Sequence, residues 1–162
     1  MSVFDDLTEM NFKLVQSIAL LESLLQHTER TEPRADSAQN EKELRDLIDG
    51  EVVPHFEIED KVVFPILERL PGMDRQLIAG LIEEHKRILS KVEELWSIRS
   101  RHIDVVSAAR AALLKDQIVR DIRAHASKEN DKLLPMSRRL ATVEQATQLR
   151  KILEEERKTE QT

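Results

Sequence analysis

Two stretches decide how this chain folds: HFEIEDKVVFP at residues 55–65 and HASKENDKLLP at residues 125–135. Each begins with a histidine, which is followed by a glutamate four positions later and by a proline ten positions later. A step of four residues places the histidine and the glutamate on one face of an α-helix, one turn apart. The repeat therefore predicts two helices that present the same pair of side chains.

The rest of the chain follows the period of amphipathic helices. Apolar side chains recur at steps of three and four residues, whereas the strict alternation typical of a β-strand is absent. We predict a short fifth helix from about residue 142 and four long helices before it, at residues 3–28, 40–70, 74–100 and 106–139. The predicted fold is all-α: an up-down-up-down four-helix bundle over residues 1–140, with residues 141–162 as a C-terminal helix and tail on the same domain.

Three breaks separate the long helices. Segment 28–39 is polar and contains a proline, segment 70–74 has the composition of a Pro-Gly turn, and segment 99–107 is a weaker break. Pro54 falls inside the second helix, where it removes a backbone donor. We therefore expect a kink in that helix just before His55.

Composition narrows the classes of function. The net charge of −6 disfavours a nucleic-acid partner. The absence of cysteine excludes disulfides, thiolate zinc sites and iron–sulfur ligation, and it fits a reducing cytoplasm. The N-terminal residues do not have the pattern of a signal peptide, and no stretch approaches the roughly 20 apolar residues of a membrane span. We expect a cytoplasmic protein without a membrane partner.

Several polar residues occupy positions where the helical pattern calls for core side chains. They are Asn11, His55, Glu59, His85, His125 and Glu129. In an up-down-up-down bundle, residues equally distant from a turn lie at the same height. The midpoints between Asn11 and His55, between His55 and His85, and between His85 and His125 all fall in predicted connections. One polar residue from each long helix is therefore predicted to lie in one layer of the core.

This layer has the composition of a metal site. Two carboxylates without partners would be very costly to bury, whereas imidazoles and carboxylates together are ligands for divalent or trivalent metals. A lone histidine on an apolar face is more often an ordinary core residue, but a repeated His-Glu pair with a third histidine at matching height favours a metal site. We interpret His27 and His102 as surface residues, and Glu57, Asp60 and Glu84 as solvated or in the outer shell of the site.

With these residues in place, the chain resembles the hemerythrin-like (HHE cation-binding) family over about residues 5–140. The segments HFEIEDKVVFP, EEHKRI and HASKENDKLLP are similar to the second, third and fourth motifs of that family. The resemblance implies a non-haem di-iron site in which Glu59 and Glu129 bridge two ions. His85 and His125 would hold one ion and His55 the other.

The first motif of the family departs from the pattern here. Asn11 stands where the family has a histidine, and it could supply an amide oxygen as a weaker ligand. The occupancy of the second ion, a mononuclear site and the identity of the metal are therefore open, and zinc or manganese would accept much of this ligand set. Leu89 stands where oxygen-carrying members have a further histidine, which argues against dedicated oxygen storage.

Three functions remain open at this stage. The first is a metal-binding, non-enzymatic protein that senses or handles O₂, NO or redox state through iron. The second is a di-iron enzyme that acts on peroxide or NO, or that assists the repair of iron centres. The third is a structural helical bundle with a degenerate or mononuclear site. The chain is expected to be a monomer or a homodimer.

Overall fold

The structure is a computed structural model that describes residues 2–31, 36–99 and 104–160, without the side chains of 24–31, 36–41, 99 and 160. Every secondary-structure element in this part of the chain is helical. None of its helices has the length and hydrophobicity needed to cross a membrane. The prediction of an all-α fold is confirmed, whereas His27 and His102 lie outside the described side chains.

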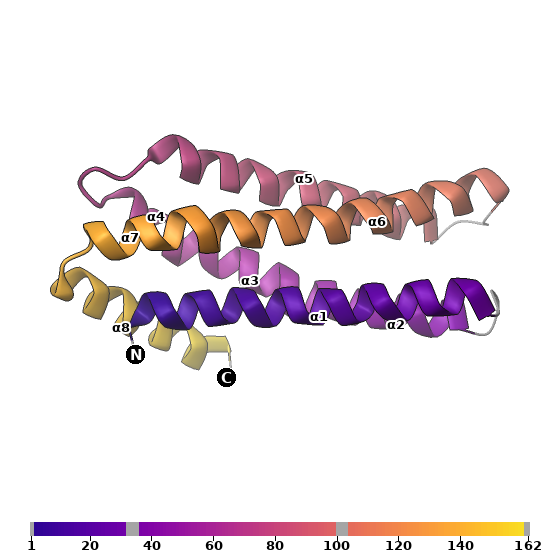
Figure 1. The fold of residues 1–162 in the computed structure, drawn as a ribbon, viewed down its shortest axis with the longest axis horizontal. Helices are drawn as coiled ribbons and strands as arrows, with labels where there is room; N and C mark the ends of the chain where they lie inside the picture. Colours follow the sequence, from indigo (N-terminus) through magenta and orange to yellow (C-terminus); the bar gives the residue numbers. More distant parts are fainter. Residues whose placement is uncertain (1, 32–35, 100–103, 161–162) are drawn as a thin grey trace.

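Four antiparallel arms form the bundle (Figure 1). The first arm is α1 (Val3–Thr31) and the third is α5 (Arg75–Arg99). The second arm is continuous through α2 (Asp36–Leu47), η1 (Ile48–Val52), α3 (Val53–Ile58), η2 (Glu59–Val63) and α4 (Phe64–Glu68). The fourth arm comprises α6 (Val105–Lys128), η3 (Glu129–Leu133) and α7 (Leu134–Leu140). A last helix, α8 (Val143–Glu160), follows them and folds back beside α1 (Figure 1).

The helix ends agree with the predicted breaks except in the first one. Residues 28–31 and 36–39 are helical, although we predicted a loop over 28–39. The proline of this segment lies in the undescribed part, and the flanking residues are charged or small side chains that a helix accepts readily. At the start of α8 a capping box is present: Thr142 N–H donates to Gln145 Oε1 at 2.9 Å, and Gln145 N–H donates to Thr142 Oγ1 at 3.1 Å.

Each of the three π-helical turns ends one residue before a proline. In η1, η2 and η3 the residue before the proline donates its N–H to the carbonyl five residues back: Val53 to Ile48, Phe64 to Glu59 and Leu134 to Glu129. A proline cannot donate to the fourth carbonyl back, and its ring clashes with that carbonyl, so a wider turn accommodates it without ending the helix. The kink expected at Pro54 thus takes the form of a π turn.

The apolar core is split into two clusters. One cluster contains Phe4, Leu67 and Leu81 and is joined by Leu149 and Leu153 of α8. The other surrounds residues such as Ile18, Leu95, Ile118 and Phe56 toward the opposite end of the bundle. The buried polar residues Asn11, Glu59, His85, His125 and Glu129 are in neither cluster. They form a polar layer between the two, as the height argument predicted.

Candidate metal centre

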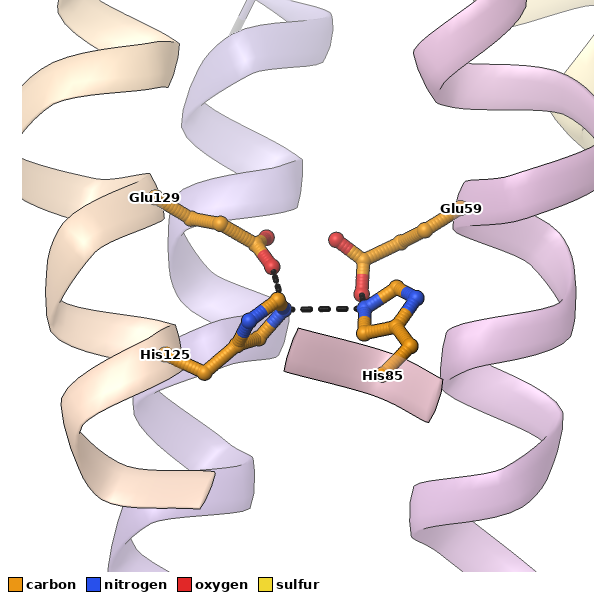
Figure 2. Close-up of side chains that lie close together, drawn as sticks. All are labelled: Glu59, His85, His125 and Glu129. Carbon is orange, nitrogen blue, oxygen red and sulfur yellow. Dashed lines mark hydrogen bonds and ion pairs between the residues drawn. The ribbon is translucent and has the colours of Figure 1, made fainter. Parts of the chain in front are cut away.

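Four side chains converge in the polar layer (Figure 2). They are Glu59 of η2, His85 of α5, His125 of α6 and Glu129 of η3, and one potential ligand atom from each lies within 4.8 Å of the others. All four are buried, with 1–4% of their surface exposed. In Figure 2 both carboxylates and both rings point toward one common centre. The bundle thus concentrates two imidazoles and two carboxylates in its buried interior.

Each of the two imidazoles has a carboxylate at its Nδ1 atom, on the side of the ring away from the centre. The Nδ1 atom of His85 lies 2.8 Å from Asp60 Oδ1, and that of His125 lies 2.8 Å from Glu84 Oε2. The other oxygen of Glu84 pairs with Lys128. A carboxylate can only accept, so each Nδ1 carries a proton and donates it, and in the neutral ring the Nε2 lone pair is then free to coordinate. Asp60 and Glu84 therefore fix the tautomer and direction of both rings.

The two Nε2 atoms face each other across 2.9 Å. In two neutral rings with their protons on Nδ1, each Nε2 directs a lone pair at the centre, and two lone pairs at this distance repel each other unless a proton or a metal ion lies beside both. The distance is close to that between two adjacent imidazole ligands of one ion in an octahedral shell, for which metal–nitrogen bonds of ~2.1 Å give ~3.0 Å. The donor set therefore fits a metal ion.

The carboxylates also lack partners suited to their charge. Glu59 Oε1 and Glu129 Oε1 are fully buried without a hydrogen-bond donor among the described residues. Each oxygen instead lies beside an imidazole nitrogen: Nε2 of His55 is 3.1 Å from Glu59 Oε1, and Nε2 of His125 lies beside Glu129 Oε1. Burial and the neighbouring carboxylate of Glu129 raise the pKa of Glu59 well above its usual range. Two such oxygens beside two imidazole nitrogens compensate one another only if they share a proton or a cation.

His55 takes a different place from the other histidines. Its Nε2 lies 3.1 Å from Glu59 Oε1, but the ring is outside the group of four that converges. Burial lowers the pKa of His55, which favours the neutral ring. The side chain retains 12% exposure and lines an open groove of about 560 Å³ beside α1. His55 is thus at the edge of the centre, between the carboxylates and solvent.

Asn11 does reach the centre, but as a hydrogen-bond donor. Its Nδ2 lies 3.1 Å from Glu129 Oε2 and 3.0 Å from Asn130 Oδ1. The amide is 2% exposed and therefore belongs to the buried layer. The predicted layer of four helices is complete, although the arm α1 contributes an amide N–H where the other arms contribute ligand atoms.

Aromatic rings enclose one side of the centre. The Phe56 ring stacks on His85 with centroids 3.9 Å apart, and Phe64 lies nearly parallel to the same imidazole at 5.5 Å. Phe56 also meets His125 edge-on at 5.4 Å. These contacts exclude water from the pair of histidines and limit rotation of their rings.

Sequence reasoning placed the ligand candidates but left their supporting residues undecided. Asp60 and Glu84 hold the imidazoles, whereas Glu57 is exposed. The sequence pattern did not identify Lys128 or Asn130 as supporting residues. Their positions in the sequence could have indicated this role, since Asp60 and Asn130 directly follow the two glutamates and Glu84 directly precedes His85.

Comparisons with known proteins give one family. The model of the hemerythrin HHE cation-binding domain matches residues 2–137, which is most of the chain. The search of curated proteins gives no match. The search of solved structures gives none either. The match spans all four arms of the bundle and all of the converging side chains.

Proposed function

This chain belongs to the hemerythrin HHE cation-binding family, and on this premise we propose that it is a non-haem iron protein that senses or handles O₂, NO or redox state. The ligands would be Glu59, His85, His125 and Glu129, with His55 at the edge of the centre. One observation carries the proposal: Asp60 and Glu84 aim the Nε2 atoms of two imidazoles at a point between two buried carboxylates.

Iron suits this mixture of nitrogen and oxygen donors. Neutral imidazole and carboxylate together are intermediate in softness, and sites of this kind with open positions are typical of non-haem iron. Bound iron would supply a redox couple and open coordination positions for a small ligand. The protein's own residues bind the ion, orient the two rings and exclude bulk water from the side that Phe56 and Phe64 cover.

A route for a small ligand lies on the other side. The outer groove and a narrow inner space of about 10 Å³ share Met10 and His55 in their walls, and the inner space also touches Glu59 and Glu129. Space of this size holds about one water-sized molecule. The arrangement favours a diatomic ligand over a larger organic substrate, which supports handling of O₂ or NO.

Metal analysis tests the proposal. The protein is loaded anaerobically with ferrous iron, freed of excess metal and analysed by plasma mass spectrometry, and its optical spectrum is followed on exposure to air and to NO. We expect iron to be retained and the spectrum to respond to at least one of the two gases. Iron retained without any response would favour a structural role for the metal, and steady consumption of peroxide would favour an enzyme.

A further inference from the structure

The two halves of the centre are related by an approximate twofold repeat, which lets equivalent positions be compared. His55 and Glu59 correspond to His125 and Glu129, seventy residues later. Asn11 corresponds to His85, seventy-four residues later. The same two offsets pair Asp60 with Asn130 and Glu84 with Met10. Each residue that supports a ring in one half thus has a counterpart in the other half.

Contacts confirm the first of these correspondences. Asp60 Oδ1 lies 2.8 Å from Nδ1 of His85, and Asn130 Oδ1 lies 3.0 Å from Nδ2 of Asn11. The residue after each glutamate therefore accepts a hydrogen bond from the residue on the neighbouring arm. In one half the pair is a carboxylate with an imidazole, and in the other half it is an amide with an amide.

The second correspondence shows a matching loss. Glu84 accepts a hydrogen bond from Nδ1 of His125, whereas the equivalent Met10 has no carboxylate to offer His55. None of the described residues makes a hydrogen bond or ion pair with Nδ1 of His55. The half with His85 and His125 has two imidazoles and two supporting carboxylates. The half with Asn11 and His55 has one imidazole, and neutral residues stand in place of the other imidazole and of both carboxylates.

The direction of the Asn11 amide follows from its neighbours. A flipped amide would bring its oxygen about 3 Å from a carboxylate oxygen of Glu129, where two acceptors would repel each other. The N–H₂ group must therefore face Glu129. Asn11 presents protons to the Glu129 oxygen that a second ion would share, and it does not present a lone pair.

We infer that the centre takes one metal ion, held by Glu59, His85, His125 and Glu129, and that Asn11, which is held in place by Asn130, replaces the second ion by donating a hydrogen bond to Glu129. This inference rests on the proposed function, because it assumes that the centre binds metal. The amide donor compensates part of the charge on Glu129 Oε2. His55 then faces the groove beside Glu59 as the remainder of the second position.

Restoring the missing pair tests the inference. Wild type and the double variant Asn11→His/Asn130→Asp are loaded anaerobically with ferrous iron, and iron per chain is measured by plasma mass spectrometry, with helicity checked by circular dichroism. We expect about one iron per chain for wild type and about two for the double variant, because metal affinity follows the number of suitable ligands. The matched control His85→Asn/Asp60→Asn makes the other half neutral as well, and it should retain no iron.

A single variant keeps the test decisive if the double variant fails to fold. Asn11→Ala removes the amide donor without adding a ligand, and wild-type stoichiometry is expected to persist. About two irons per chain in the wild type, loss of the single iron in Asn11→Ala, or one iron in a folded double variant would each overturn the inference and leave the proposed function intact. Wild type without any iron would overturn both.

Discussion

The two halves of the centre differ in how firmly their histidines are held. His125 has a carboxylate on Nδ1, a salt-bridged lysine behind that carboxylate and an aromatic ring beside it. His55 has Glu59 on Nε2, and its other side faces an open groove. Both histidines sit in the same sequence motif, so their surroundings, and not the motif, decide which of them is positioned to bind a metal.

Removing His125 should have the largest effect on iron binding. In His125→Ala the ion would keep a single imidazole, and Oε1 of Glu129 would lose the imidazole beside it. We expect iron binding to fall to background, as measured by plasma mass spectrometry after anaerobic loading. Retention of iron at wild-type level would mean that His55 can take the place of His125 and that the two halves are equivalent.

Acidification should release the metal because it protonates His125. Burial opposes protonation of His125, but the neighbouring carboxylates of Glu129 and Glu84 raise its pKa above the ordinary value. Protons therefore compete with the metal at His125 as the pH falls, whereas burial keeps His55 neutral to lower pH. We expect most of the iron to be lost between about pH 7 and 5. Dialysis across this range with metal analysis measures it, and iron that stays bound at pH 5 would contradict the expectation.

Weakening the support behind His125 should have an intermediate effect. Glu84→Gln retains the shape of the side chain but removes the charge that fixes the ring and pairs with Lys128. Changes of this type lower metal affinity by about 10–100-fold. Competition with a chelator of known affinity measures the change. Met10→Leu, at the equivalent position of the other half, is the matched control and should leave the affinity unaltered.

The smallest effect is expected for His55→Ala. If the single ion is held by the other four residues, the variant keeps about one iron per chain, and its affinity falls by less than about 10-fold. The same chelator competition provides the measurement. Loss comparable to that of His125→Ala would show that His55 is a full ligand, and the contrast between the halves would have to be abandoned.

Much of the fold follows from sequence because the helical period and the turn residues are local signals. The repeated His-Glu pairs and the equal heights of Asn11, His55, His85 and His125 were sufficient to place the polar layer. The predicted loop over 28–39 is wrong at both flanks, because a proline indicates a break without showing how far the helices on either side extend toward it.

The division of roles within the layer could not be predicted in the same way. Periodicity gives the face of a helix on which a residue lies, but not which atom of a side chain meets which partner on another arm. The donor role of Asn11 and the support from Asp60 and Glu84 depend on such contacts. The same holds for His55, whose motif matches that of His125 although its surroundings do not.

The π turns before Pro65 and Pro135 fix the rotation of the candidate metal centre relative to the apolar core that follows it. Glu59 and Glu129 open these turns, and buried side chains such as Phe64 and Leu134 follow them. A π turn contains one residue more than the α-helical turn that it replaces, and each residue of a helix corresponds to a rotation of about 100°. Deleting one residue from either turn would rotate the glutamate away from the centre or the next apolar residues out of the core. The length of these two turns is therefore as constrained as the identity of the ligands, and insertions or deletions there should be far less tolerated than most substitutions.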